Sequence, residues 1–144
     1  FEYVYDTNEE NRKIAVALAA MWQAVGVKAQ PVNVDFGQLN RQVRTGAFDV
    51  ARWSYFASFD DPIALLQLYA GDNTNNYAGY LNPEYDRLLL ESNVTRDPAA
   101  RRELLEKAET ILVRDAPITP VSLPSRPGPN GCAVPYKPVP ARPA

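Results

Sequence analysis

The first 53 residues alternate between two apolar patterns, and this alternation restricts the fold more than any other feature of the chain. Residues 1–5, 27–34 and 48–53 have the aromatic and β-branched composition of strands, and the stretches between them carry apolar residues at helical spacing. Strands and helices that alternate with short links form a parallel sheet through right-handed crossovers. We therefore predict an α/β fold, a β-α-β-α-β lobe whose small, mainly parallel sheet is flanked by helices, with the strand order 2-1-3. Pro31 lacks the N–H that a central strand needs, which favours an edge position for the second strand.

Capping residues mark the ends of the predicted helices. Thr7 and Glu10 fit a capping box before the first helix, and Asp35 caps a second helix that ends at Gly46. Three later helices are expected to begin at Asx-Pro pairs, because the Asx oxygen accepts hydrogen bonds from free backbone N–H groups and proline fits the first helical position. These pairs are Asp61-Pro62, Asn82-Pro83 and Asp97-Pro98.

Apolar side chains at helical spacing predict one buried face on three of these helices. They are Ile14, Leu18, Met21 and Val25 in the first helix, Phe36, Leu39 and Val43 in the second, and Leu104, Ala108, Ile111 and Leu112 in the last. The charged residues of the last helix point largely the other way and are expected to form a solvated face. They are Arg101, Arg102, Glu106 and Glu109.

The character of the chain changes after residue 117. Residues 118–123 are predicted to form a last short strand, but residues 117–144 hold nine of the thirteen prolines and show little apolar periodicity. Such composition does not build a packed core. We therefore divide the chain into an α/β lobe, residues 1–123, and a proline-rich, poorly ordered tail, residues 124–144.

Composition excludes several classes of function. The formal net charge of −2, with acidic and basic residues interspersed, leaves no basic field for a nucleic-acid backbone. The longest apolar runs are much shorter than the roughly 20 residues that a membrane helix needs. The chain has no histidine, which removes the Ser-His-Asp and Cys-His mechanisms and the commonest transition-metal ligand. Paired carboxylates such as Asp60 and Asp61 are the remaining catalytic alternative, and helix capping already accounts for Asp61. We predict no enzyme, no metal site, no cofactor, no nucleic-acid partner and no membrane span.

An aromatic loop follows the third strand within the stretch Gly46–Pro62. Ligands of open α/β sheets bind beyond the carboxyl ends of the strands, and several aromatic residues are concentrated at that point. They are Trp53, Tyr55, Phe56 and Phe59. Each ring taken alone is better explained as core packing, but as a cluster in one loop the rings are difficult to bury together. We predict that at least two of them contact a ligand. Asn75 and Asn76, in a later polar loop, are explained better by local turns than by ligand contacts.

Ordered segments of the chain resemble a known family. No segment is specific by itself, but together they follow the family's order over residues 1 to about 121. They are Asn11–Ala15, Gly46–Arg52, Asp61-Pro62, Asn76–Tyr80, Asn82–Leu89, Arg101–Glu109 and Asp115–Val121. The chain resembles the C-terminal lobe of bacterial oligopeptide- and dipeptide-binding proteins, the extracytoplasmic solute-binding components of ABC importers (family 5).

The resemblance implies a lobe of the type II periplasmic-binding-protein architecture, in a two-lobed receptor that closes on an extended peptide. This chain is then part of one lobe, and it binds a peptide or peptide-like small solute that is delivered to the permease of an ABC importer. The implied location is periplasmic or otherwise extracytoplasmic. Because the chain opens without Met on the strand-like residues 1–5, we expect the signal peptide to lie outside this chain, which we interpret as a fragment or a processed form.

The resemblance also implies a change at the ligand site. In such receptors the loop after the Phe-Asp strand carries an aspartate that pairs with the free amino terminus of the peptide, and Ser58 occupies its place here. A hydroxyl accepts a hydrogen bond from an ammonium group without supplying charge, and charge-assisted bonds are about twice as strong as neutral ones. Asp60 is the expected substitute. A sugar-like, blocked or otherwise modified ligand is therefore favoured over an ordinary free-amino peptide.

Three further positions match the family. Phe36 and Tyr55 align with aromatic residues that line its pocket. Arg52 matches a family arginine and is expected either to bind an acidic ligand group or to form a salt bridge with Asp49 or a loop carboxylate. The predicted ligand-binding residues are Phe36, Arg52, Trp53, Tyr55, Phe56, Ser58 and Asp60.

Two alternative functions stay open at the level of the sequence. Similar domains also occur in transcription regulators, where this chain would be the ligand-sensing domain, and an upstream helix-turn-helix in place of a signal peptide distinguishes the two cases. In the other alternative the isolated chain has no binding activity of its own and self-associates. Half a cleft supplies half of the contacts, and an uncovered apolar face invites a second copy.

Overall fold

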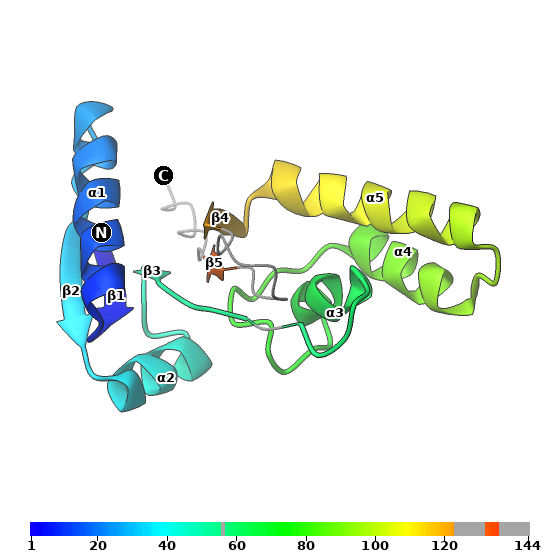
Figure 1. Ribbon diagram of the computed structural model, residues 1–144, viewed down its shortest axis with the longest axis horizontal. Helices are drawn as coiled ribbons and strands as arrows, with labels where there is room; N and C mark the ends of the chain where they lie inside the picture. The colour runs from blue at the N-terminus through cyan, green and yellow to red at the C-terminus, as the bar shows by residue number, and fades with distance from the viewer. Residues whose placement is uncertain (56, 123–131, 136–144) are drawn as a thin grey trace, which may run out of the picture.

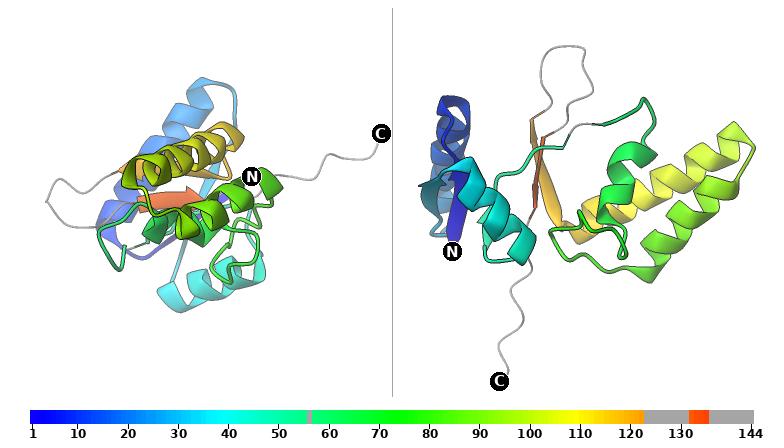
Figure 2. Two further views of the ribbon diagram at one scale, coloured as in Figure 1. Left: turned by 90° about the vertical axis from the view of Figure 1, so that its right-hand side faces the viewer. Right: turned by 90° about the horizontal axis from the view of Figure 1, so that it is seen from below.

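A small sheet with two helices lies at one end of the molecule, and a helical hairpin lies at the other (Figure 1). The computed structural model describes residues 1–55, 57–122 and 132–135. In chain order the elements are β1 (Glu2–Asp6), α1 (Glu9–Ala24), β2 (Gln30–Val34), α2 (Phe36–Thr45), β3 (Val50–Ala51), α3 (Ile63–Leu66), the 3₁₀ helix η1 (Gln67–Tyr69), α4 (Pro83–Val94), α5 (Pro98–Asp115), β4 (Ile118–Ser122) and β5 (Cys132–Pro135). β4 and β5 lie between the two ends, as Figure 1 and Figure 2 both show.

The three-stranded sheet has the order β2-β1-β3 with parallel pairing, which confirms the predicted α/β lobe. β2 is an edge strand, as Pro31 requires. β3 is limited to Val50–Ala51 and is shorter than the predicted strand 48–53. The backbone N–H of Arg52 still donates to Val4 O at 2.8 Å, but its guanidinium folds back onto the residues that follow, so the chain leaves the sheet there.

The predicted capping box of the first helix is wrong by one residue. Asn8, not Thr7, caps α1, and Asn8 Oδ1 accepts a hydrogen bond from Glu10 N at 2.8 Å. Thr7 lies at the end of β1 beside β2, where its hydroxyl donates to Asn33 Oδ1 at 3.0 Å and to Val34 O at 3.1 Å. The Thr7 hydroxyl, which the sequence assigned to the cap of the first helix, is therefore used in the contact between β1 and β2.

The predicted starts of α2, α4 and α5 and the predicted end of α2 are confirmed. Asp35 Oδ1 accepts a hydrogen bond from the third residue of α2, and Gly46 ends that helix with a φ of 70°, a left-handed conformation that favours glycine. Asn82 and Asp97 cap α4 and α5 through their side-chain oxygens, each followed by proline at the start of the helix. These signals are local, which is why the sequence shows them.

The buried face of α1 differs from the predicted one. Met21 and Val25 are 66% and 74% exposed, whereas Ala15 is fully buried. The small side chain of Ala15 lets the helix approach the sheet closely. Trp22 then packs edge-on against Tyr3, with ring centroids 5.6 Å apart. The helix therefore presents Ala15 and Trp22 to the sheet, and the predicted apolar stripe is partly turned to solvent.

Three apolar clusters form the core of the described residues, and one of them, Tyr3, Tyr5, Ala15 and Val50, lies between α1 and the sheet. The sheet core consists of Val4, Val34, Leu39, Val43, Phe48 and Ala51. The helical core consists of Ile63, Leu66, Tyr69, Tyr85, Leu88, Leu89, Leu105, Ala108, Ile111 and Leu112. The predicted inner face of α5 is thus confirmed, with Leu105 added and Leu104 half-buried at its margin.

β4 pairs with β5 in an antiparallel ribbon. β4, Ile118–Ser122, corresponds to the predicted last strand. β5, Cys132–Pro135, lies within the segment 124–144 that the sequence assigns to the tail, and the rest of that segment lies outside the described residues.

Candidate ligand-binding site

Five aromatic rings contact one another in a continuous series, here called the aromatic row. Phe36 stacks on Trp53, with ring centroids 6.0 Å apart and an angle of 12° between the rings. Trp53 meets Tyr77 edge-on at 5.7 Å, and Tyr77 stacks on Tyr55 at 6.3 Å. Tyr55 in turn meets Tyr69 edge-on at 6.1 Å. Both geometries are favourable for aromatic pairs.

The aromatic row begins at the carboxyl-terminal edge of the sheet and ends in the helical core. Phe36 follows β2 and Trp53 follows β3, so both rings lie beyond strand ends that point the same way. Phe36 is 61% exposed, Trp53 and Tyr55 are half-buried, and Tyr69 is 4% exposed. The predicted burial of Phe36 with Leu39 and Val43 is therefore wrong. Phe36, at the solvent-exposed end of the row, is available to stack on a planar or apolar group. Tyr69, at the other end, is held in the helical core.

Tyr55 and Tyr77 are fixed by one asparagine. The Tyr55 hydroxyl donates to Asn75 O at 2.6 Å, and burial raises the pKa of Tyr55. The Tyr77 hydroxyl donates to Asn75 Oδ1 at 3.1 Å, and the guanidinium carbon of Arg44 lies 5.9 Å from the centre of the Tyr77 ring. Asn76 donates to backbone carbonyls near its own loop. The predicted local role is confirmed for Asn76, whereas Asn75 also accepts the hydroxyl of Tyr55, 20 residues away.

Arg52 fixes the start of the aromatic loop. Its side chain is buried, and Nη1 donates to Trp53 O at 2.7 Å and to Ser54 Oγ at 2.8 Å. Asp49, one predicted salt-bridge partner, accepts the backbone N–H of Glu2 at 2.9 Å. Arg52 therefore sets the turn from β3 into the loop, and its contact with a ligand stays a prediction.

The second half of the loop is exposed to solvent. Ser58, Phe59 and Asp60 are all exposed, Phe59 by 49%. Phe56 lies outside the described residues. The structure therefore brings Phe36, Trp53 and Tyr55 of the predicted set into one row, whereas Ser58 and Asp60 lie in the exposed half of the loop. Their contact with a ligand stays a prediction.

Asp61 ends the loop and is fully engaged. Its Oδ1 accepts a hydrogen bond from Ile63 N at 2.9 Å, but α3 begins one residue later than predicted, with Pro62 and not Asp61 at the N-cap position. Its two oxygens also pair with Arg101 of α5, with Nη1 to Oδ2 at 2.7 Å and Nη2 to Oδ1 at 3.0 Å. The prediction that Arg101 belongs to a solvated face is therefore wrong, because α3 packs against α5 and brings Asp61 within reach.

The family was identified by comparison of the sequence with known proteins. The sequence pattern of the bacterial extracellular solute-binding proteins, family 5 (middle), matches residues 1–77, which is more than half of the chain. The chain belongs to this family. The matched residues include all five rings of the aromatic row, from Phe36 to Tyr77.

Individual members of family 5 are similar to most of this chain. The periplasmic oligopeptide-binding protein OppA of Haemophilus influenzae is 34% identical over 126 residues, which cover 84% of this chain and 23% of OppA. The periplasmic murein peptide-binding protein MppA of Escherichia coli is 33% identical over 119 residues, which cover 82% of this chain and 22% of MppA. The crystal structure of H. influenzae OppA in complex with RPPGFSPFR has a TM-score of 0.82 and 30% identity, covering 96% of this chain and 26% of that one. The chain therefore spans about a quarter of the length of these relatives.

Two members of the aromatic row, Tyr69 and Tyr77, were not predicted as site residues. Tyr77 lies in the segment Asn76–Tyr80, one of the segments that resemble family 5, and that resemblance was the available signal. Nothing in the sequence around Tyr69 indicates a site residue, because its ring is explained equally well as part of the apolar core. Both join Trp53 and Tyr55 only through the packing of a later loop.

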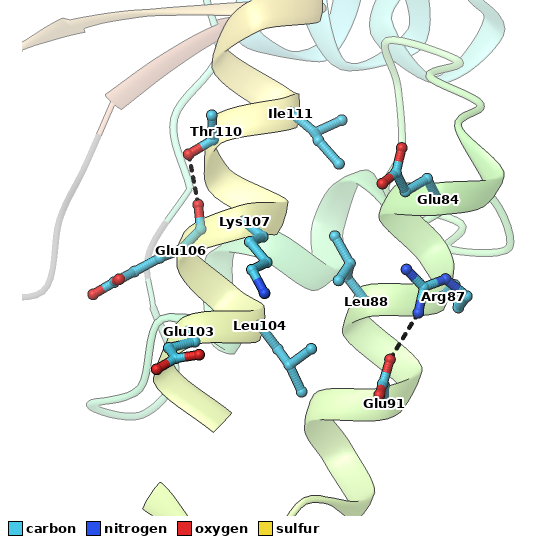
Figure 3. Close-up of a pocket in the computed structure, with 10 residues that line it drawn as sticks. All are labelled: Glu84, Arg87, Leu88, Glu91, Glu103, Leu104, Glu106, Lys107, Thr110 and Ile111. Atoms are coloured by element: carbon cyan, nitrogen blue, oxygen red, sulfur yellow. Dashed lines mark hydrogen bonds and ion pairs between the residues drawn. The ribbon is translucent and has the colours of Figure 1, made fainter. Parts of the chain in front are cut away.

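A groove lies between α4 and α5 in the described part of the chain (Figure 3). Its volume is about 800 Å³, and all of its lining residues come from these two helices. Leu88 and Ile111 on its floor are already buried, and Arg87 on one rim pairs with Glu91 at 2.8 Å. No aromatic ring lines this groove, so the aromatic row is the better candidate for stacking a ligand.

The described residues show neither a cluster of metal ligands nor a helix that could cross a membrane. Within residues 1–55, 57–122 and 132–135, no group of three or more histidine, cysteine, aspartate or glutamate side chains is placed to hold a metal ion. None of the helices in these ranges combines the length and the hydropathy that crossing a bilayer requires.

The ion pair of Asp61 predicts a specific acid dependence of stability. Hydrogen bonds from Arg101 and from Ile63 N hold the pKa of Asp61 below its ordinary value of 3.8. Because the unfolded chain binds this proton at a higher pH than the folded chain, the contribution of Asp61 is complete well above pH 3.8 and is lost as the pH falls through the lowered pKa. An NMR titration of the Asp61 carboxyl group measures this pKa, and Asp61→Asn is expected to remove this part of the acid dependence. A midpoint at or above 3.8 contradicts the prediction.

Proposed function

We propose that this chain is the ligand-binding lobe of an extracytoplasmic receptor for peptides or peptide-like solutes, which delivers its ligand to an ABC importer. The observation that carries the proposal is the aromatic row, because its solvent end lies at the carboxyl ends of β2 and β3. The printed names of two relatives, an oligopeptide-binding and a murein peptide-binding protein, support the ligand class. The comparisons lend no support to a transcription regulator.

The proposed mode of binding is stacking without chemistry. The half-exposed rings of Phe36 and Trp53 supply a flat apolar surface, and the polar loop residues near them orient the ligand. Ser58 contributes a neutral hydroxyl where a charged anchor is expected in the family. A ligand without a free amino group is therefore accepted at least as well as one that has it. The relatives are named as binding proteins, which supports binding rather than catalysis here.

Nuclear magnetic resonance of the ¹⁵N-labelled 144-residue chain tests the proposal. The probes are tri-alanine and N-acetyl-tri-alanine. We expect the indole N–H of Trp53 to shift on titration, and the acetylated probe to bind at least as tightly. Because one lobe supplies only part of a cleft, the dissociation constant is expected in the millimolar range, which corresponds to about −4 kcal/mol.

Trp22 is the internal control in the same spectrum. It contacts Phe1 and Tyr3 on the α1 side of the sheet and is no member of the aromatic row. Equal shifts of both indoles, or no shift of Trp53 with either probe at saturating concentration, would overturn the proposed site.

A further inference from the structure

The ion pair between Arg101 and Asp61 differs in kind from the other ion pairs of the described residues. Arg12–Glu9 and Arg87–Glu91 each lie within one helix, and Arg114–Asp115 joins neighbours. Arg101 and Asp61 are 40 residues apart and only 28% exposed. Both carboxylate oxygens are engaged by one planar guanidinium, which fixes orientation as well as distance. This pair therefore holds two distant parts of the chain in one geometry.

The aromatic loop is attached at its start, middle and end. Arg52 holds its start through Trp53 O, and Tyr55 holds its middle through Asn75. Asp61 holds its end, where Asp61 N also donates to Phe59 O at 3.0 Å and tightens the turn. Ser58 and Asp60 lie just before Asp61, so the ion pair between Asp61 and Arg101 is the attachment nearest to them along the chain.

We infer that Arg101 is a positioning residue for the ligand site: by holding Asp61, it fixes the loop segment that carries Ser58 and Asp60. The inference does not involve any contact between Arg101 and the ligand. A loop that is ordered before binding loses less conformational freedom when the ligand arrives, so the gain appears as affinity. The ligand part of the inference rests on the proposed function, and the loop part rests on the geometry of the ion pair.

The test uses amide hydrogen exchange in the 144-residue chain without ligand. In Arg101→Gln, the amides of Ile63 and Ala64, which hydrogen-bond to Asp61, are expected to exchange about tenfold faster or more, because the end of the loop opens locally. The amide of Ala108, in the α5 core, is expected to change by less than about threefold. Arg101→Lys keeps the charge but loses the planar guanidinium. Its exchange rates at Ile63 and Ala64 are expected to lie between those of the unaltered chain and those of Arg101→Gln.

Arg87→Gln is the matched control, because it removes the same charge and breaks an ion pair that lies within α4 and does not involve the loop. Asp61→Asn keeps an acceptor for Ile63 N and removes the charge, and it is expected to reproduce Arg101→Gln. The double variant is expected to be no worse than either single variant. Equal acceleration at Ile63 and Ala108 would show a general loss of stability and would overturn the inference, as would the absence of any difference from Arg87→Gln.

Binding of N-acetyl-tri-alanine then separates the inference from the proposed function. We expect Arg101→Gln to raise the dissociation constant about tenfold and Arg87→Gln to leave it unchanged. Binding by the unaltered chain that Arg101→Gln does not weaken overturns the inference alone. No binding by the unaltered chain overturns the proposed function, and the ligand role of Arg101 with it, whatever the exchange rates show.

Discussion

Tyr85→Ala is expected to lower the free energy of unfolding by about 3–5 kcal/mol. Tyr85 is fully buried in the helical core, its ring meets Tyr80 edge-on at 5.5 Å, and its hydroxyl donates to Leu66 O at 2.6 Å. Removal of the ring leaves a cavity between α3 and α4 and an unsatisfied carbonyl. Since domains of this size are stable by about 5–15 kcal/mol, the loss is a large share of the total. Urea unfolding followed by circular dichroism measures it.

Two further variants divide this effect into its parts. Tyr85→Phe keeps the ring and leaves Leu66 O without its partner, which is expected to cost about 1–2 kcal/mol. Leu90→Ala, on the same helix at a position 69% exposed, is expected to change the free energy of unfolding by less than about 0.5 kcal/mol. A Tyr85→Ala variant as stable as Leu90→Ala would show that the helical core does not depend on this ring.

Tyr77→Ala is expected to uncouple the two ends of the molecule and to remove ligand binding. Tyr77 packs on the sheet core and stacks on Tyr55, which packs on the helical core, so its ring joins the two. Loss of two aromatic contacts costs about 1–3 kcal/mol. Trp53 also loses its edge contact, so the surface offered to a ligand is no longer fixed. We expect the affinity for N-acetyl-tri-alanine to fall at least about tenfold.

Unfolding of the Tyr77→Ala variant should no longer be two-state. Trp53 fluorescence reports the sheet end and far-ultraviolet circular dichroism reports mainly the helices, and the midpoints of the two urea transitions are expected to separate. Tyr77→Phe keeps the ring and loses only a half-buried hydroxyl contact to Asn75, so its transitions should coincide. Coincident transitions in Tyr77→Ala would contradict the idea that the row couples the two ends.

Under the proposed function, the aromatic row is a surface of the ligand site that is ordered before the ligand arrives. The row supplies the surface, and hydrogen bonds or an ion pair at three points hold the loop that carries it. Such preorganisation raises affinity by reducing the entropy lost on binding.

The sequence alone determined the type and order of the elements from β1 to β4 except η1, the strand order of the parallel sheet and most helix ends. Those features depend on signals within a few residues: apolar periodicity, a capping oxygen beside its helix, glycine at a left-handed position. The order β2-β1-β3 followed because short parallel crossovers allow few alternatives. Where only neighbouring residues decide the structure, the error of the prediction was small. The cap of α1 is Asn8, one residue after the predicted Thr7.

Only the tertiary structure decided which side chains meet. Nothing near Arg101 in the sequence shows that it pairs with Asp61, and a polar helix face gives the same pattern whether its charges are solvated or paired. Likewise Tyr77 joins Trp53 and Tyr55 because a later loop folds back over the sheet edge. Local patterns set the conformation of a segment, but contacts between segments distant in the chain depend on how all of them pack at once, and the candidate site is made of such contacts.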